Sequence, residues 1–192
     1  MEYHLTLPLK KEDIQKIKIG DILYITGTLF TARDEAHLKM LELPKNQIPF
    51  DPSTMGLFHC GPLMKQTDHG WQVVSAGPTT SSRMEIFEDK FLDKFNTTLI
   101  IGKGGMGENT LNALKKTPAI YAAYTGGAGA LAADRVKKVP NVYWLDELGM
   151  PEAVWIFEVD SFGPIVVAMD AHGNSIYKKL KKGEKAGITL PN

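Results

Sequence analysis

The apolar residues of this chain fall into short runs that glycine and proline separate, and the spacing within the runs alternates between strand and helix periods. Residues 21–27 predict a strand buried on both faces, because nearly every position is apolar or β-branched. After this strand, apolar residues recur at helical spacing, and Thr31 with Asp34 forms a capping box. We therefore expect a helix that ends before Pro44.

The same reasoning predicts alternating strands and helices, followed by strands alone in the last third of the chain. A turn is expected at 68–70, and a second turn at 170–173 is typical of a hairpin. This order predicts a single α/β domain of mixed sheets with a helical layer over residues 1–180, with a polar tail at 181–192. The expected strands are 57–60, 71–76, 97–101, 119–124, 142–145, 153–159, 165–169 and 175–179, and the expected helices are 83–95, 108–115 and 129 to about 137.

Composition narrows the classes of function. With 22 basic and 22 acidic residues, the chain has no net charge that would attract nucleic acid or an anionic membrane. No signal peptide is recognisable, and no apolar run approaches the length of a membrane span. Cys60 is the single cysteine, so the chain can neither form an internal disulfide nor hold an iron–sulfur cluster by itself. A reducing compartment, the cytoplasm, fits this cysteine content.

The loop 102–107 matches the G-x-G-x-x-G pattern of dinucleotide-binding folds, between a predicted strand and a predicted helix. A nucleotide site would also need an acidic residue after the next strand, and residues 119–129 contain neither Asp nor Glu. We therefore favour an anion seat, in which N–H groups at the helix start and the Lys103 ammonium bind a carboxylate or phosphate. The simple alternative is a turn whose glycines adopt positive φ.

Three expected junctions between a strand and a helix carry cations or hydroxyl groups. Arg33 lies in the first turn of a predicted helix, Lys103 lies in the glycine loop, and four consecutive hydroxyl residues, 79–82, precede Arg83. A guanidinium suits a carboxylate because it donates two parallel hydrogen bonds. Taken singly, a hydroxyl could cap a helix and the arginines could pair with nearby acidic residues. Three such junctions in one small domain favour a binding site for a small dicarboxylate.

These segments resemble the signature blocks of the C-terminal domain of class I fumarases, which also occur in the β subunit of L(+)-tartrate dehydratase. The blocks follow the family's order over nearly the whole chain, and the GPTTSxRM block at 77–84 is highly specific. His59 and Cys60 depart from the tyrosine-rich stretch expected there. The matching blocks are Gly20-Asp21, Gly27, Thr31 to His37, Gly61-Pro62, Gly77 to Met84, Gly102 to Gly104, Gly126 to Ala128, Leu148-Gly149 and Glu152 to Trp155.

The resemblance implies a swivelling β/β/α domain and a hydro-lyase that is inactive without a partner. It implies that an α subunit holds a [4Fe–4S] cluster, that Thr79 is the catalytic base, and that Arg33, Arg83 and Lys103 bind the substrate carboxylates. We expect reversible hydration of fumarate to malate, with dehydration of L(+)-tartrate as the alternative. The chain itself is expected to bind no metal, and to form homodimers within a larger heteromer.

Two rival functions and the role of one histidine are left open. The chain could be a dinucleotide-binding dehydrogenase module, or a subunit that only docks on or regulates the cluster protein. His37 lies one helical turn after Arg33, where it either orients the site or is an ordinary structural histidine. Cys60 is expected in the core. The other histidines lack any ligand spacing; they are His4, His59, His69 and His172.

Overall fold

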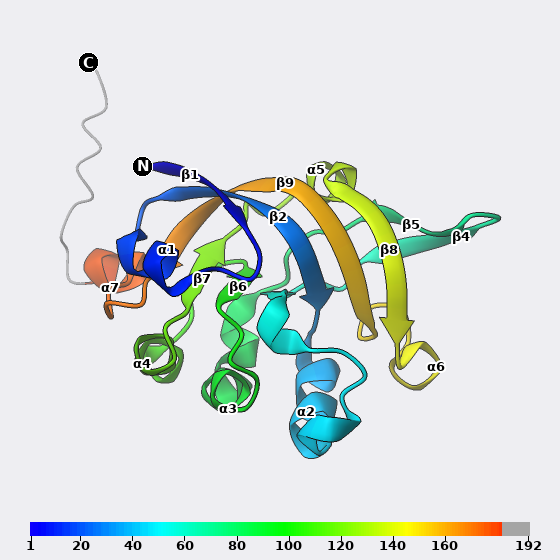
Figure 1. Ribbon diagram of the computed structural model, residues 1–192, viewed down its shortest axis with the longest axis horizontal. Helices are drawn as coiled ribbons and strands as arrows, with labels where there is room; N and C mark the ends of the chain where they lie inside the picture. Colours follow the sequence, from blue (N-terminus) through cyan, green and yellow to red (C-terminus); the bar gives the residue numbers. More distant parts are fainter. Residues whose placement is uncertain (182–192) are drawn as a thin grey trace.

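A strongly curved sheet forms the framework of the molecule, and the computed structural model describes it within residues 1–181 (Figure 1). The strands are β1 (Glu2–Thr6), β2 (Ile22–Thr31), β3 (Gly56–Phe58), β4 (Leu63–Thr67), β5 (Gly70–Ser75), β6 (Leu99–Gly102), β7 (Ile120–Ala123), β8 (Val136–Tyr143) and β9 (Val154–Met169). Seven of them pair in the order β1-β2-β3-β6-β7-β9-β8, while β4 and β5 form a separate two-stranded hairpin.

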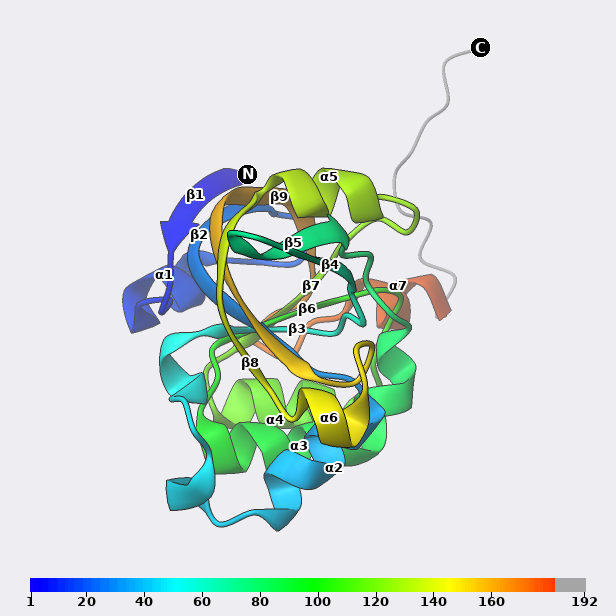
Figure 2. The ribbon, with the colours of Figure 1, turned by 90° about the vertical axis from the view of Figure 1, so that its right-hand side faces the viewer.

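Three helices, α2 (Asp34–Glu42), α3 (Glu85–Phe95) and α4 (Glu108–Lys116), cover one side of the curved sheet, as Figure 2 shows. The shorter elements are α1 (Lys11–Lys16), α5 (Gly129–Asp134), α6 (Leu145–Leu148), α7 (Ile176–Lys181) and the 3-10 turns Lys45–Gln47, Pro52–Thr54 and Ser81–Met84. Within residues 1–181, no helix is both long and apolar enough to cross a membrane.

The direction of the strands determines where a site can form. β1, β2, β3, β6 and β7 are parallel to their neighbours in this series, whereas β9 is antiparallel to β2, β7 and β8. Because β9 pairs with both β7 and β2, the series β2-β3-β6-β7-β9 returns to its first strand and the sheet curls on itself. The carboxyl ends of β2, β3, β6 and β7 meet at one edge, which is the edge where open α/β sheets bind ligands.

Alternation along the strands divides the core into two layers. Leu99 and Ile101 of β6 pack with the apolar cluster inside the curved sheet. Ile100, between them, packs in the second cluster with Phe91 of α3 and Leu111 of α4. Successive side chains of a strand point to opposite faces, so a strand covered on both sides has to be apolar at every position.

The expected α/β fold of mixed sheets with a helical layer is confirmed. The helix expected before Pro44 is α2, but the predicted Thr31 capping box is wrong, because Thr31 is the last residue of β2. Its hydroxyl donates to the Ala153 carbonyl (3.3 Å) and accepts the Trp155 N–H (3.0 Å), so pairing with β9 uses the group that would have capped the helix. Arg33 is the N-cap residue and does not lie in the first turn.

The remaining differences follow from long-range pairing. The two strands expected at 153–159 and 165–169 are one continuous strand, β9, and the predicted helix end at 135–137 is wrong because β8 already begins at Val136. The strand expected at 175–179 is also wrong, because α7 begins at Ile176. Asp170 accepts the N–H groups of His172 and Asn174, and this turns the chain out of the sheet. The turn expected at 68–70 joins β4 to β5. Residues 182–192 of the expected polar tail lie outside the described residues.

Candidate active site

The loops that leave the parallel strands bring the expected site residues to one edge of the sheet. Arg33 follows β2, His59 follows β3 and Lys103 follows β6. The hydroxyl-rich segment after β5 joins two of these loops, since the Thr79 N–H donates to the His59 carbonyl (2.7 Å) and the Ser81 N–H donates to the Lys103 carbonyl (3.0 Å). Main-chain contacts therefore connect residues that are far apart in sequence.

Gly102, the last residue of β6, permits the closest of these approaches. A Cβ atom at Gly102 would lie 1.8 Å from Ser81 Oγ and 3.1 Å from His59 Nδ1. Ser81 is fully buried, and its Oγ accepts the Lys103 N–H (3.1 Å) and lies 2.9 Å from His59 Nδ1. The glycine is therefore needed for the room it leaves beside Ser81.

Arg33 is held from its Nε side. Arg33 Nε lies 3.1 Å from Glu152 Oε1, and the other oxygen of Glu152 accepts the Glu35 N–H (3.1 Å). Burial raises the pKa of the Glu152 carboxyl, and the Arg33 guanidinium opposes that shift. Gly61 lets the arginine pack against the main chain, because a Cβ atom there would lie 2.7 Å from Arg33 Nη1.

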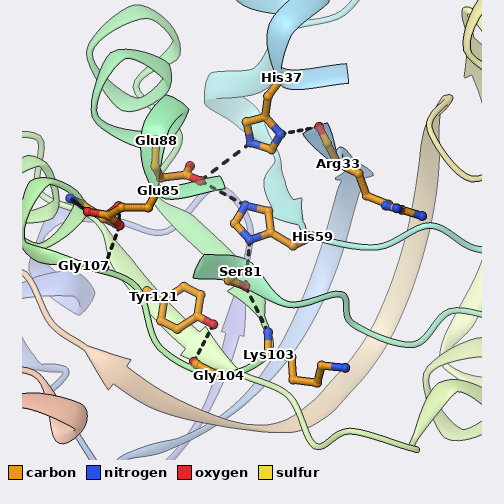
Figure 3. A network of polar contacts seen from close by, with 11 residues as sticks. Arg33, His37, His59, Ser81, Glu85, Glu88, Lys103, Gly104, Gly107 and Tyr121 are labelled. Atoms are coloured by element: carbon orange, nitrogen blue, oxygen red, sulfur yellow. Dashed lines mark hydrogen bonds and ion pairs between the residues drawn. The ribbon is translucent and has the colours of Figure 1, made fainter. Parts of the chain in front are cut away.

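Arg83 lies in the 3-10 turn before α3, and its Nη2 donates to Asp34 Oδ2 (2.6 Å). The Arg83 side chain is 50% exposed, so water screens this pair. The expected alternative, pairing with a nearby acidic residue, is seen for Arg83 with Asp34, whereas Arg33 pairs with the distant Glu152. Arg33 and Lys103 extend toward the same side in Figure 3. A cavity of about 410 Å³ lies elsewhere, against β5, α5 and β8.

The consecutive hydroxyl residues do not cap a helix. Thr80 and Met84 are the N-cap residues of the 3-10 turn and of α3, and neither makes a side-chain capping hydrogen bond. Ser81 is buried between the loops, and Thr79 lies half-buried beside it. The capping alternative is therefore wrong for this segment, and the Ser81 hydroxyl is instead part of the contacts at this edge.

The helix start after the glycine loop is already occupied by a carboxylate of the chain. Glu85 accepts hydrogen bonds from the N–H groups of Gly107 (2.6 Å), Asn109 (3.1 Å) and Thr110 (3.2 Å), and from the Thr110 hydroxyl (2.6 Å). These are the donors that a phosphate or a substrate carboxylate would need. The expected anion seat at this helix start is therefore wrong, and a dinucleotide finds no free phosphate site there. Of the groups expected to form the anion seat, the Lys103 ammonium is left as a candidate ligand of a carboxylate.

Three ionisable side chains meet in the core behind this edge (Figure 3). His37 of α2, His59 and Glu88 of α3 are fully buried. Glu88 Oε2 lies 3.1 Å from His59 Nε2 and 3.7 Å from His37 Nε2. Burial lowers the pKa of His37 to about 4 and that of His59 to about 3, and it raises the pKa of Glu88 to about 7. His59, expected to lie alone, is part of a cluster.

The residues of this chain do not fit an iron–sulfur cluster. Cys60 is buried among apolar side chains, as expected, and burial raises the pKa of its thiol. Such clusters need several thiolates, so a cluster would have to be held elsewhere. Within residues 1–181, the side chains whose ligand atoms gather closely enough for a single metal ion are His37, His59 and Glu88, with all three atoms within 4.8 Å of one another.

Sequence reasoning assigned no role to Glu88, Glu85 or Glu152, although Glu152 opens one of the matching family blocks and the other two belong to no motif. One signal was present for Glu88, which stands one helical turn before Leu92 and two turns before Phe95. Both of those residues are fully buried, so Glu88 lies on the apolar face of α3. An acidic residue on the buried face of a helix needs a partner, and its position could have drawn attention to the histidines.

Comparison with known proteins completes the description. A family model described as Fumarase C-terminus matches residues 2–180. A protein of Methanocaldococcus jannaschii, provisionally named L(+)-tartrate dehydratase subunit beta, is 50% identical over 184 residues, covering 95% of this chain and 94% of the relative. The L(+)-tartrate dehydratase subunit beta of Escherichia coli is 43% identical, covering 95% and 90%. A Geobacillus stearothermophilus protein, provisionally named fumarate hydratase class I, is 39% identical, covering 93% of this chain and 34% of its own length.

Proposed function

Because this chain belongs to the Fumarase C-terminus family, we propose that it is the β subunit of a hydro-lyase that reversibly hydrates fumarate to malate. Its relatives carry the names of hydro-lyases or of their subunits. The observation that carries the proposal is that main-chain hydrogen bonds from Thr79 and Ser81 join the hydroxyl-rich segment to the loops after β3 and β6, at the carboxyl edge of the parallel strands.

In this proposal the cations bind the two carboxylates and Thr79 moves the proton. The guanidinium groups of Arg33 and Arg83 donate paired hydrogen bonds, and Lys103 adds a compact charge. In the dehydration direction, the Thr79 oxygen takes the proton from the carbon next to the distal carboxylate. The electrons of that C–H bond form the double bond as hydroxide leaves from the neighbouring carbon. An ordinary hydroxyl is a very weak base, so the neighbouring cations have to stabilise the oxyanion form of Thr79.

The ion pairs of the free chain are compatible with this role. The pair between Arg83 and Asp34 is half-exposed, and such pairs contribute only about 0–1 kcal/mol. A substrate carboxylate that replaced Asp34 would therefore displace little stabilising energy. The pair between Arg33 and Glu152 is more buried and uses Nε, so it would orient the arginine during binding.

A partner subunit would complete the open edge. The [4Fe–4S] cluster would be held by that α subunit, because this chain has one cysteine and that cysteine is buried. Leu38 and Ile86, which are 42% and 69% exposed, belong to the same helices as Asp34 and Glu85 and offer apolar surface for the partner. Homodimerisation within the heteromer, and the cytoplasm as compartment, remain part of the proposal.

Dehydration of L(+)-tartrate is a second candidate within the same class. The relatives from M. jannaschii and E. coli have nearly the length of this chain, and both are named as tartrate dehydratase β subunits. Tartrate and malate share two carboxylates on a four-carbon chain, so the same cations would bind both. An additional hydroxyl group distinguishes them, and its contacts would involve the partner subunit.

Co-expression with a cysteine-bearing partner tests the proposal. We expect a stable complex that, purified without oxygen, interconverts fumarate and malate, while the chain alone contains no iron and shows no turnover. Measuring L(+)-tartrate dehydration in the same preparation separates the two substrates. Turnover by the chain without its partner would contradict the proposal, as would a complex that is inactive on all three compounds. A shift of the melting curve with nicotinamide dinucleotides would revive the dehydrogenase function.

A further inference from the structure

The cluster of His37, Glu88 and His59, called the buried triad below, is linked at both ends to the main chain of the candidate site. At one end, His37 Nδ1 donates to the Arg33 carbonyl (2.7 Å). At the other end, His59 Nδ1 lies 2.9 Å from Ser81 Oγ, which accepts the Lys103 N–H (3.1 Å). A continuous series of polar contacts therefore runs from the carbonyl of one expected substrate ligand to the amide of another (Figure 3).

The protons of this series can be assigned from the donors and acceptors. A carbonyl can only accept, so His37 carries its proton on Nδ1 and its Nε2 is a bare acceptor. Ser81 Oγ already accepts from Lys103, and its own hydrogen can go to His59 Nδ1, which puts the proton of His59 on Nε2, facing Glu88. Glu88 then accepts from His59 and has to donate to His37. A single carboxylic proton on Glu88 completes the series with every side chain neutral.

The buried atoms need this proton. Among residues 1–181, neither Nε2 atom of the histidines nor either Glu88 oxygen finds a well-formed hydrogen bond, although all three side chains have zero exposure. Four such atoms are costly in the core unless they pair with one another. With Glu88 protonated on Oε2, that oxygen accepts from His59 Nε2 and donates to His37 Nε2, which gives both ring nitrogens and Oε2 a partner. Without the proton, His37 Nε2 and one Glu88 oxygen would face each other as two acceptors.

We propose that the buried triad is a positioning device for the proposed hydro-lyase reaction. One proton shared by Glu88 and the histidines holds the main chain of Arg33 and that of Lys103 in fixed positions relative to each other. The same device acts on Thr79, whose N–H donates to the His59 carbonyl (2.7 Å). The triad touches no substrate, because it is fully buried behind the edge. The inference rests on the proposed function for its catalytic consequence, but its structural part does not depend on the reaction.

The charges around the triad favour a proton over a metal ion. A divalent ion with one carboxylate and two neutral imidazoles would leave a net positive charge at zero exposure, whereas one proton leaves the triad neutral. Glu85 and Asp89 on the same helix raise the pKa of Glu88 further, and Asp34 raises the pKa values of both histidines against the effect of burial. Burial is the main cause of the raised pKa of Glu88, which reaches about 7, and the His37 ring opposes that shift.

Two substitutions at Glu88 and one matched control test the device. Glu88→Gln keeps an acceptor for His59 and supplies a permanent donor to His37, so it preserves the neutral series. Glu88→Leu removes both contacts at similar volume. Asp170→Asn is the control, because Asp170 is equally buried and polar but its contacts are to Ile19, His172 and Asn174, away from the site.

Hydrogen–deuterium exchange of the isolated chain gives the structural measurement. In Glu88→Leu we expect the amides of residues 33–37, 79–83 and 102–104 to exchange about tenfold faster or more, because the contacts that close these loops are lost. Glu88→Gln should exchange like the wild type, and Asp170→Asn should change exchange only around its own turn. Unchanged exchange of these three segments in a folded Glu88→Leu chain would overturn the proposal.

Kinetics of the assembled complex give the functional measurement. We expect kcat/KM to fall about tenfold or more in Glu88→Leu, while Glu88→Gln and Asp170→Asn stay within about threefold of the wild type. A purely structural triad predicts instead that Glu88→Leu and Asp170→Asn both lower stability and leave kcat/KM per folded complex unchanged. If the wild-type complex turns over no dicarboxylate, the proposed function fails, and the exchange experiment still decides the positioning.

Metal analysis of the isolated chain covers the case in which Glu88→Leu does not fold. We expect no stoichiometric zinc or other transition metal in the wild type, and normal folding and activity in Glu88→Gln. One metal ion per wild-type chain that is lost in Glu88→Gln would overturn the proton assignment. A folded Glu88→Gln enzyme with a more than tenfold loss of kcat/KM would do the same, because it would show that the site needs the carboxylate itself.

Discussion

A carboxyl side chain is buried beside each of two opposite edges of the sheet, and the two carboxyl groups differ in their hydrogen bonds. Asp170 follows β9, whose last residues pair near the start of β2, and its oxygens accept the N–H groups of Ile19, His172 and Asn174 and the Asn174 side-chain amide. Glu88 lies behind the carboxyl edge and makes no well-formed hydrogen bond to any residue of the described range 1–181. Both side chains are fully buried.

This difference shows that burial by itself does not mark a functional carboxylate. Asp170 closes a turn and has all the donors that an ionised group needs, so it is explained by the fold. Glu88 has two histidine rings in place of backbone donors, and burial raises its pKa to about 7. The unsatisfied group lies at the edge where the expected substrate ligands gather, which supports assigning function to that edge and stability to the other.

The largest effect expected is on turnover at the carboxyl edge. Thr79→Ala in the assembled enzyme should lower kcat by roughly 10²-fold or more, because the base acts only as the proton leaves while the cations still bind substrate. Thr79→Ser should keep much of the activity. Steady-state kinetics normalised to cluster content measure both. Near-normal turnover in the alanine enzyme would show that Thr79 is not the base. It would also contradict the assignment of function to one edge of the sheet and of stability to the other.

The same chemical change at the two carboxylates should have different effects on stability. Asp170→Asn replaces a carboxylate oxygen with an NH2 group, which cannot accept the backbone N–H groups around it. We expect this substitution to lower the free energy of unfolding by about 1–3 kcal/mol. Glu88→Gln should leave that free energy nearly unchanged, because its amide fits between the two histidines. Urea unfolding of the isolated chains at neutral pH compares them. Equal losses would mean that both carboxylates are ionised and structural.

The pH dependence of stability sharpens the comparison further. Burial lowers the pKa of His37 to about 4 and of His59 to about 3, so these groups make stability fall as the pH drops below the ordinary value of 6.5. Burial raises the pKa of Glu88 from 4.5 to about 7, which acts in the opposite direction between those values. Between pH 4.5 and 6.5 the unfolded chain therefore binds about one more proton than the native triad.

We expect the triad to contribute a loss of about 1.4 kcal/mol per pH unit on acidification in that range, and about twice this slope in Glu88→Gln. The variant is steeper because its native state no longer holds the compensating proton. Denaturant unfolding at several pH values measures the difference between the two chains, in which all other titrating groups cancel. Parallel curves would show that Glu88 is ionised in the native protein.

The smallest effect expected is that of Arg83→Ala on the isolated chain. Its pair with Asp34 is half-exposed, so the free energy of unfolding should change by no more than about 1 kcal/mol. In the assembled enzyme the same substitution should weaken substrate binding by about 2–5 kcal/mol if the carboxylate contact is desolvated. Thermal unfolding and KM measure the two effects. A large loss of stability with unchanged KM would show that Arg83 stabilises the fold and does not bind substrate.

Much of the architecture follows from local patterns. The spacing of apolar residues predicted α2, α3, α4, β6 and β7, because each of these elements has its periodicity within a few residues. The predictions failed where pairing with a distant strand decided the outcome. Thr31 belongs to β2 because it pairs with Phe58 of β3 and its hydroxyl accepts the Trp155 N–H of β9, and residue 136 begins β8 because it pairs with Val159 of β9. Ser175 to Lys179 have strand-like residues but lie beyond the turn that Asp170 closes.

For the site, the sequence alone suggested candidate residues, and the tertiary structure decided how these residues are arranged. The motifs at Arg33, at 77–84 and at Lys103 are local and could be recognised without a fold. That the helix start after the motif at 102–107 offers no seat for an anion, because Glu85 occupies it, depends on a contact between separate segments. The meeting of His37, His59 and Glu88 is of the same kind, since burial and pairing are set by how the helices pack on the sheet and not by neighbours along the chain.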